Sequence, residues 1–355
     1  MTDIFQERRE KVRAQLKDQG MDAYLVLHPA NRYYLSGFEL HDPQCNESAG
    51  VLVIVGNGQD VLCTDPRYLE AAKRVWPEDA IFIYRNKRTP ALVDYLKKQR
   101  LGRLGFESRI MSHELFAALD AQMSLIPHQG LVEELRVTKD ADELERMRAS
   151  CKLNHDVFTA LPSMLAPGTS EQEVAWLIER YFREHGASEL AFSPIVAMDR
   201  NAAMPHSIPG LNRLTAQSLL LVDVGGRFRD YCSDQTRTFW VGETPGPVFQ
   251  RTLELVQKAQ QKAIQAVRPG MDIKDLYQVA WDFFDRHQVA DRFTHALGHG
   301  IGLETHEYPG LGPKAQGKLE SGMVITIEPG LYYPEWGGIR WEHMVVVTED
   351  GAQPL

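Results

Sequence analysis

Two largely apolar runs in the second half of the chain each end on an acidic residue. Residues 219–222 lead directly into Asp223, and residues 323–327 lead into Glu328, with glycines close behind each acid. Short apolar runs bounded by glycine and proline predict buried β-strands. A carboxylate at the end of a buried strand costs free energy unless a partner compensates it. The fold must therefore satisfy buried negative charge in two places.

A second acid follows the first run at a distance typical of a hairpin. The glycines 225–226 predict a turn, after which a returning strand carries Asp234. If the hairpin is symmetric about residues 228 and 229, Asp234 lies opposite Asp223, and the two carboxylates repel unless a cation or proton lies between them. An alternative needs no metal: Asp234 pairs with Arg237 while Asp223 caps the turn.

The second apolar run repeats this arrangement and favours a metal site over the metal-free alternative. Glu342 is expected inside a strand that returns after a loop rich in Tyr, Pro and Gly, where it can face Glu328. Arg340, two residues earlier, shares the face of Glu342 because side chains alternate along a strand. Four acids in two apolar hairpins are difficult to satisfy without metal ions.

Histidine ligands are also available. His299 stands between Gly298 and Gly300, which leave the backbone open to close approach and disfavour a helix, so this is not the HExxH helix of zinc peptidases. His206 follows Met204-Pro205 and is a second candidate, although a lone histidine in such a segment is more often structural.

The first part of the chain has the pattern of a separate α/β domain. Helices are predicted over 3–19, 89–100 and 112–123, and strands over 23–27, 51–55 and 80–84, with a loop after residue 27. The pattern changes near residue 133, and a long helix is predicted over 140–161. We therefore expect two domains, 1–132 and 133–355.

The second domain contains a weak internal repeat. Residues 165–171 and 267–273 both contain a Pro-Gly turn followed by an N-cap candidate, Ser170 or Asp272. A pair of aromatic residues and a histidine follow at the same offset in each copy. The repeat predicts two related halves with a cleft between them.

Composition excludes several classes of partner. The net charge of -9 argues against a nucleic acid or an anionic membrane as partner. We find no signal-peptide core and no apolar run long enough to span a bilayer. The four cysteines are far apart, which argues against disulfides and a thiolate metal site and favours the cytoplasm: Cys45, Cys63, Cys151 and Cys232.

Four local sequences together resemble a known family. SDQTRTF at 233–239, GHGIGLETHE at 298–307, IEPG at 327–330 and GIRWE at 338–342 occur in the order found in the M24 metallopeptidases, which include methionine aminopeptidase, aminopeptidase P and prolidase. Residues 1–132, with YYLSGF at 33–38, resemble the N-terminal domain of the creatinase/prolidase branch. The resemblance implies an α+β protein with a C-terminal pita-bread catalytic domain after a smaller α/β domain.

The resemblance also implies two divalent metal ions per chain. Asp223 would chelate one ion, His299 and Glu328 would bind the other, and Asp234 and Glu342 would bridge the two. Oxygen-rich ligands favour Mn²⁺, with Co²⁺ or Zn²⁺ as alternatives. The ions would activate a water molecule to hydrolyse the peptide bond that precedes proline, with Glu328 also moving protons.

Further roles follow from the same resemblance. His206 and His306 would hold the peptide and stabilise the tetrahedral intermediate, and His295 would lie near the proline pocket. Arg340 would bind substrate or support the metal ligands. Aromatic side chains are candidates for the pocket wall, although each can equally belong to the core: Tyr332, Trp336 and Trp341.

Two departures from the family bear on specificity. Many dipeptidases carry an Arg shortly after the His-Glu pair to meet the substrate carboxylate, whereas here the chain has Gly310, and the nearest cation is Lys314. This favours an aminopeptidase that cuts longer peptides, with a strict dipeptidase as the alternative. His343 replaces the usual Asp after Glu342. A non-peptidase hydrolase or lyase, or an inactive binding module, remains a further alternative, and relatives suggest a homodimer.

Overall fold

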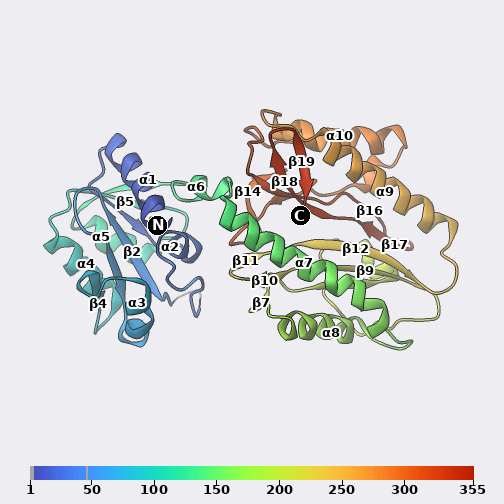
Figure 1. Cartoon of the computed structure of the whole chain (residues 1–355), viewed down its shortest axis with the longest axis horizontal. Coiled ribbons are helices and arrows are strands. Elements are labelled where there is room, and N and C mark those ends of the chain that lie inside the picture. Colours follow the sequence, from blue (N-terminus) through green and yellow to red (C-terminus); the bar gives the residue numbers. More distant parts are fainter. Residues whose placement is uncertain (1–3, 45–46) are drawn as a thin grey trace. The chain divides into compact units, whose positions relative to one another are not determined.

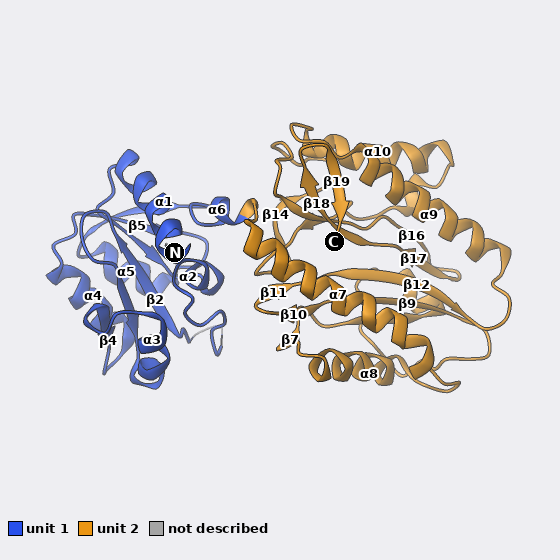
Figure 2. Cartoon of the chain, in the orientation of Figure 1, with its two compact units in different colours: residues 1–136 blue, residues 137–355 orange. Residues whose placement is uncertain are grey.

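The computed structural model describes residues 4–44 and 47–355, so Cys45 and the first residue of the helix predicted over 3–19 lie outside the described residues. The chain divides into two compact units, residues 1–136 and 137–355 (Figure 2). The boundary expected after residue 132 stands at the start of helix α6, Glu133–Val137, whereas the division into units falls inside that helix.

Unit 1 is built on one mixed sheet with the strand order β4-β3-β2-β1-β5-β6 (Figure 1). Strand β1 pairs antiparallel with β2 and parallel with β5. The strands predicted over 23–27, 51–55 and 80–84 are confirmed as β1, β2 and β4. The strands of this sheet are β1 Ala23–Val26, β2 Gly50–Val55, β3 Val61–Thr64, β4 Ile81–Ile83, β5 Arg103–Glu107 and β6 Ser124–His128.

The helices of unit 1 include the three that the sequence predicts. These helices are α1 Ile4–Asp18, α2 Pro29–Ser36, α3 Leu69–Val75, α4 Arg88–Lys98 and α5 His113–Asp120. The loop expected after residue 27 is wrong, because α2 forms there. Pro29 opens this helix with its fixed φ, and Gly37, at φ 71°, closes it in the left-handed conformation that glycine adopts readily.

Unit 2 contains two helix pairs, and Figure 1 shows α8 on one side of the strands and α9 and α10 on the other. The helices are α7 Ala141–Met164, α8 Glu171–Glu184, α9 Pro247–Ala266 and α10 Ile273–Arg286. The first half carries the sheets β12-β9-β8 and β11-β10-β7, and the second carries β14-β13-β15-β18-β19 and the ribbon β16-β17.

The strands of the first half are β7 Glu189–Leu190, β8 Ile195–Met198, β9 Ser218–Val224, β10 Gly226–Phe228, β11 Tyr231–Cys232 and β12 Gln235–Val241. The strands of the second half are β13 His299–Gly300, β14 Glu307–Gly310, β15 Val324–Ile327, β16 Gly330–Tyr333, β17 Gly337–Arg340, β18 His343–Thr348 and β19 Gly351–Pro354. Short 3₁₀ turns follow β3, α3, β8 and α10, at Pro66–Tyr68, Glu78–Ala80, Asp199–Ala203 and Ala290–Arg292.

The internal repeat corresponds to two matched helices. Helices α8 and α10 each have 14 residues and begin directly after the predicted N-cap residues. Ser170 caps α8 through a reciprocal capping box with Glu173. Asp272 holds the predicted N-cap position of α10, but its side chain makes no capping hydrogen bond and lies 3.0 Å from Lys318. A basic side chain within reach of the carboxylate replaces the backbone amide as its partner.

Strand β9 lies between two hydrophobic cores and shows which way the first acid points. Leu220 and Val222 pack into the core of α7 and α8, while Leu219 and Leu221 pack into the core of α9 and α10. Because side chains alternate along a strand, Asp223 continues the row that faces the second half. The strand therefore directs this carboxylate towards the space between the two halves.

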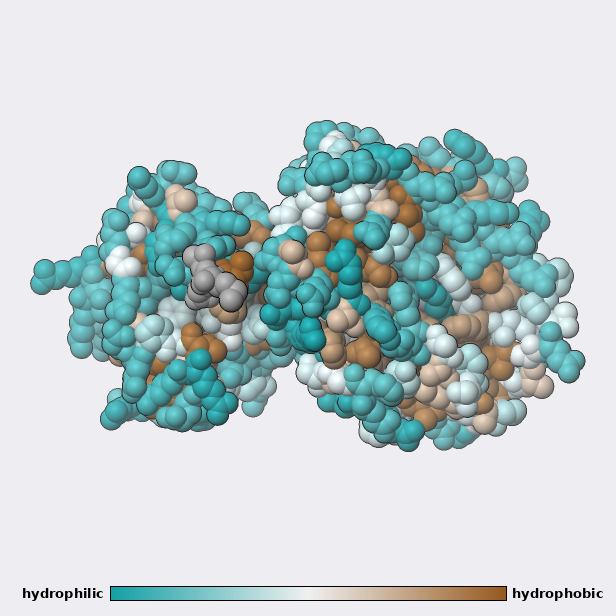
Figure 3. Space-filling model, viewed as in Figure 1, coloured by the Kyte–Doolittle hydropathy of each residue, from teal (hydrophilic) through white to brown (hydrophobic). Residues whose placement is uncertain are grey.

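The visible face of the molecule is mostly hydrophilic, with apolar side chains between polar ones (Figure 3). None of the helices in the described part of the chain combines the length and apolar character that crossing a bilayer requires. Three cysteines are buried free thiols: Cys63, Cys151 and Cys232.

Candidate metal centre

The first hairpin brings Asp223 and Asp234 together in a register different from the one expected. The turn lies at Arg229 and Asp230, whose φ angles are 49° and 74°, and the strands pair Asp223 with Thr236. The predicted direct pairing of Asp223 with Asp234 is therefore wrong by two residues. A shift of two keeps every side chain on its face, so Asp234 still projects on the same side as Asp223.

The glycines of this hairpin serve close packing, not the turn. A Cβ added to Gly225 would lie 1.8 Å from the carbonyl oxygen of Ser233, so no other residue fits there. The metal-free alternative is also wrong for Asp234. Arg237 donates to the carbonyl oxygens of Thr236 and Glu342 instead, the former at 2.9 Å.

The second hairpin places Glu328 opposite Glu342, as predicted. The ladder on one side pairs Ile327 with His343, and the ladder on the other pairs Gly330 with Arg340. Both acids lie in the gap between these ladders, so Glu342 is not inside a strand as expected. Because the ladder is interrupted here, the two carboxylates do not have to follow the regular alternation of side chains along a strand.

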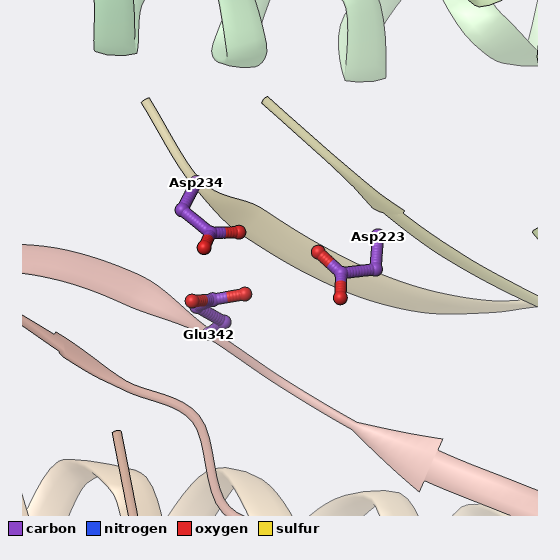
Figure 4. A group of neighbouring side chains, drawn as sticks. All are labelled: Asp223, Asp234 and Glu342. Carbon is purple, nitrogen blue, oxygen red and sulfur yellow. The ribbon is translucent and has the colours of Figure 1, made fainter. Parts of the chain in front are cut away.

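Three of the predicted ligands form one tight group. Asp223, Asp234 and Glu342 each offer a carboxylate oxygen, and these oxygens lie within 4.8 Å of one another. Figure 4 shows the carboxylates of Asp223 and Asp234 turned towards that of Glu342, which comes from the opposite side. All three residues are buried, and Oδ1 of Asp223 and Oε1 of Glu342 have no hydrogen-bond partner among the described residues.

The electrostatics of this group are unfavourable in the absence of a cation. Burial, followed by the charges of Glu342 and Asp223, raises the pKa of Asp234 well above its usual range. Burial and the charges of Glu328 and Asp223 do the same to the pKa of Glu342. Partnerless carboxylate oxygens at this spacing fit a hard divalent ion, which would satisfy the oxygens and neutralise the charge.

His299 and Glu328 lie next to the three carboxylates. The Nε2 atom of His299 is 3.4 Å from Oε1 of Glu328 and 3.6 Å from Oδ2 of Asp234. Nδ1 of the same ring is 3.0 Å from the carbonyl oxygen of Gly300, which fixes the tautomer with Nε2 as the free lone pair. Burial and the neighbouring His306 lower the pKa of His299 to about 4, so the ring is neutral, as a metal ligand must be.

The glycines that flank His299 are explained by neighbouring backbone. A Cβ on Gly298 would lie 2.0 Å from the carbonyl oxygen of Thr326, and one on Gly300 would lie 2.2 Å from that of Tyr308. The prediction of close approach is confirmed, and the approaching group is the protein's own chain. Thr326 also receives the backbone N–H of His299 and donates to Glu328 Oε1 at 3.2 Å.

Arg340 connects the two hairpins. Its Nη2 atom donates to Oδ2 of Asp223 at 2.7 Å, its Nη1 atom to the hydroxyl of Tyr332 at 2.9 Å, and its Nε atom to Thr236 Oγ1 at 3.0 Å. Thr236 Oγ1 in turn donates to Glu342 Oε2 at 2.7 Å. The guanidinium and Thr236 together orient one carboxylate from each hairpin.

A cavity of about 590 Å³ opens beside these residues. His206 and His306 line it with exposed side chains, and His295 lines it with Nε2 2.9 Å from the hydroxyl of Tyr332. Of the residues predicted to bind metal, move protons or hold substrate, Glu342 alone does not line the cavity. The structure therefore brings the predicted residues into one place, with the carboxylates at the base and two histidines accessible.

Of the two alternatives for the aromatic candidates, the core is confirmed, because Tyr332, Trp336 and Trp341 do not line the cavity. The guanidinium carbon of Arg237 lies 4.5 Å from the centroid of the Trp341 ring. The ring centroids of Trp336 and Tyr333 are 5.1 Å apart, and neither tryptophan lines the cavity. The apolar lining comes from residues that carry no motif: Phe192, Pro194, Ile195, Pro205, Ile208 and Pro209. Their closeness in sequence to His206 was the available signal. Thr236 and Thr326 were also missed, because nothing in the sequence shows which hydroxyl reaches a carboxylate.

Comparison with known proteins identifies this arrangement. Residues 145–349 match metallopeptidase family M24, and residues 8–138 match the creatinase/prolidase N-terminal domain. The chain belongs to metallopeptidase family M24. The resemblance inferred from the four local sequences is confirmed, as is the predicted α+β fold with its two domain types. This M24 chain is a metallopeptidase, and the family depends on divalent metal ions.

Relatives of this M24 chain match almost its whole length. It is 32% identical to the Xaa-Pro dipeptidase of Pyrococcus furiosus over 99% of this chain and 98% of that protein. The structure of an Xaa-Pro dipeptidase from Bacillus anthracis has a TM-score of 0.91 and 30% identity, covering 99% of this chain and 97% of that one. The structure of an X-Pro aminopeptidase from Thermotoga maritima has a TM-score of 0.85 and 28% identity, and the match covers 96% of this chain and 97% of that one.

Proposed function

We propose that this chain hydrolyses the peptide bond that precedes proline, with two divalent metal ions bound between its two hairpins. The observation that carries the proposal is the group of buried carboxylates with partnerless oxygens at the base of a cavity. The names of relatives on both sides of the dipeptidase and aminopeptidase division support a proline-directed peptidase.

Five side chains would hold the ions: Asp223, Asp234, His299, Glu328 and Glu342. Asp234 is suited to bridge two ions because it lies near the other two carboxylates and within 3.6 Å of His299 Nε2. The set is rich in oxygen and has one imidazole, which favours Mn²⁺ over the ions that prefer thiolates. When bound, such ions polarise a carbonyl group and lower the pKa of a water molecule.

The other cavity residues have separable roles in this proposal. Glu328 would carry a proton from the attacking water to the proline nitrogen, which must leave as an amine. His206 and His306, both exposed at the cavity, would donate hydrogen bonds to the oxygen on which negative charge develops. His295, held by the Tyr332 hydroxyl, would border the proline ring, and Arg340 would fix Asp223.

We further propose that peptides longer than dipeptides are preferred. Among the described residues that line the cavity, Arg340 is the single lysine or arginine, and its guanidinium is already bound to Asp223, Tyr332 and Thr236. A dipeptide's carboxylate therefore meets no available lysine or arginine side chain among these lining residues. Gly310 lines the cavity and has no atom within 4 Å of an added Cβ, which leaves space for a continuing chain. The dipeptidase names of several relatives favour the alternative of strict dipeptide hydrolysis.

The deciding experiment uses the purified chain stripped of metal and reloaded with MnCl₂. Xaa-Pro and Xaa-Pro-Yaa peptides are supplied, and released products are identified by mass spectrometry. We expect manganese-dependent release of the residue before proline, with longer peptides cleaved at least as well. Full hydrolysis by an Asp234→Ala variant after exhaustive chelation would overturn the proposal. A homodimer and a cytoplasmic location stay predictions.

A further inference from the structure

A buried ion pair lies just outside the cavity and has no part in the proposed metal site. Nζ of Lys139 is 3.1 Å from Oε2 of Glu307, and the two side chains are 1% and 7% exposed. Nζ also donates to the carbonyl oxygen of Val137 at 3.3 Å. Burying two charges costs desolvation free energy, which an ion pair offsets only when its geometry is good. A buried pair at this position therefore calls for a functional explanation.

The lysine end of the pair is fixed to the second half of unit 2. The backbone N–H of Lys139 donates to the carbonyl oxygen of Gly322 at 2.9 Å, and Thr138 forms a bridge with Met323. Residue 323 leads directly into β15, the strand that ends at Ile327, just before Glu328. Lys139 is thus anchored next to the strand that leads into a predicted metal ligand.

The glutamate end fixes the loop that carries His306. Oε1 of Glu307 accepts the backbone N–H of Glu304 at 3.2 Å. The carboxylate also lies against Gly302, where an added Cβ would come within 2.7 Å of Oε2. The same residue begins β14 and pairs with Gly300 of β13. Its side chain and backbone therefore close the loop from residue 301 to residue 306 on both sides.

His306 directly precedes Glu307, and its ring centroid lies 4.2 Å from that of His299. On the other side, Thr305 Oγ1 donates to the carbonyl oxygen of Ala191 at 3.1 Å. The exposed His306 ring is consequently placed by its two neighbours in sequence, of which Glu307 forms an ion pair with Lys139. A displacement of Glu307 would move His306 relative to the base of the cavity.

We propose that Lys139 is a positioning residue that acts through Glu307 to hold His306 in its catalytic orientation. The proposal rests on the proposed function for the role of His306, but assigns a part in it to a residue outside the cavity. Loss of the ammonium removes the Lys139 charge from the buried Glu307 carboxylate, which then moves towards water or takes up a proton. Either change releases the contacts to Glu304 and the glycine at 302.

The test is a double-mutant cycle on the manganese-loaded enzyme with Lys139→Met and His306→Ala, measured with an Xaa-Pro-Yaa peptide. We expect Lys139→Met to lower kcat by about 10- to 100-fold, with a smaller change in KM, as for other residues that orient an active-site group. In the His306→Ala background the same substitution should have almost no further effect on kcat, because the group it positions is already gone.

Glu307→Gln and Asp60→Asn are matched controls for charge loss at a buried carboxylate. Asp60 pairs with Arg9 and Arg13 in unit 1 and is 6% exposed. Glu307→Gln should reproduce the loss of kcat, whereas Asp60→Asn should lower the melting temperature and leave kcat unchanged. Thermal unfolding of every variant separates a loss of folded protein from a loss of turnover.

Two results would overturn the proposal. A fully active Lys139→Met enzyme would show that the pair does not position His306. Equal losses of kcat in the presence and absence of the His306 ring would show a general structural effect. Failure of the proposed function is distinct from both, because the unmodified enzyme would then cleave no Xaa-Pro bond, or His306→Ala would be fully active.

Discussion

Nη2 of Arg340 lies 2.7 Å from Oδ2 of Asp223, while Oδ1 of the same carboxylate has no partner among the described residues. One oxygen is therefore held and the other has no partner in the described part of the chain, in a group whose carboxylate oxygens lie within 4.8 Å of one another. Burial opposes a charge on Arg340, but Tyr332, Asp223 and Glu328 outweigh it and raise its pKa well above the usual range. The guanidinium is a permanent cation that orients a proposed metal ligand.

Substitution Arg340→Met should weaken metal binding. With its anchor removed, Asp223 can rotate, and we expect Mn²⁺ affinity to fall by about 10- to 100-fold, as for other residues that orient metal ligands. Isothermal titration with MnCl₂ measures the change. Arg200→Met is a suitable control, because Arg200 is exposed and donates to the carbonyl oxygen of Glu335. Equal affinities for the two variants would contradict the role of Arg340.

Substitution Asp234→Asn should separate stability from activity. Removing one of several mutually repelling buried carboxylates raises the melting temperature of the metal-free protein, because burial and neighbouring charges already disfavour ionised Asp234. The same change removes the proposed bridge between the ions, and we expect kcat to fall by at least about 100-fold. Calorimetry in the presence of chelator measures the melting temperature, and peptide assays in MnCl₂ measure kcat. A variant that is less stable without metal, yet active with it, would refute this interpretation.

The metal-free protein should lose stability as pH rises above 6.5. Burial raises the pKa of Glu328 from 4.5 to about 8, so the folded state keeps a proton that the unfolded chain releases, and this stabilisation is lost as pH rises through that range. His299 acts in the opposite sense, because its pKa falls from 6.5 to about 4, but its effect is complete by pH 6.5. Between pH 6.5 and 8 the effect of Glu328 remains, so the free energy of unfolding falls as the pH rises.

Manganese should reverse this trend, because it competes with protons for the same carboxylates. The rise in melting temperature on adding MnCl₂ should be larger at pH 8 than at pH 6.5, and Glu328→Gln should reduce that difference. Differential scanning calorimetry at the two pH values makes the comparison. An equal rise at both values in the unmodified protein would argue against metal binding by protonated carboxyl groups.

Substitution Gly310→Arg should shift specificity towards dipeptides. Its Cβ would point into open space at the cavity wall, so the longer side chain can reach a substrate carboxylate without displacing backbone. A charge-assisted hydrogen bond of this kind should change the ratio of kcat/KM for Xaa-Pro to that for Xaa-Pro-Yaa by about 10- to 100-fold. Gly310→Gln controls for size. If the unmodified enzyme favoured dipeptides a hundredfold, the preference for longer peptides would be wrong.

The sequence predicted both hairpins, but it misplaced the register of the first. Period-two alternation carried Asp223 and Asp234 to one face even though the turn was misplaced, because an even shift preserves the face. The left-handed residues Arg229 and Asp230 that make the turn are not glycines, and nothing local distinguishes them. Gly225 suggested a turn but serves a contact with Ser233, which becomes visible when the strands are paired.

Contacts between distant segments were beyond prediction from the sequence. The hydroxyl of Thr236 reaches Glu342, and the Lys139 ammonium reaches Glu307, across 106 and 168 residues. Tryptophans 336 and 341 seemed suited to the cavity, whereas the structure uses them in packing. Motifs identify which residue types occur together, but the hydrogen bonds that orient them depend on the folded arrangement.

The central claim is that cations neutralise the buried carboxylates, and a direct count of bound metal tests it. The chain is stripped with chelator, confirmed to be folded by circular dichroism, and titrated with MnCl₂ while bound manganese is measured by elemental analysis after removal of free ion. We predict two ions per chain, falling in the Asp234→Asn variant. A folded chain that binds no manganese, cobalt or zinc at saturating concentration would contradict the account.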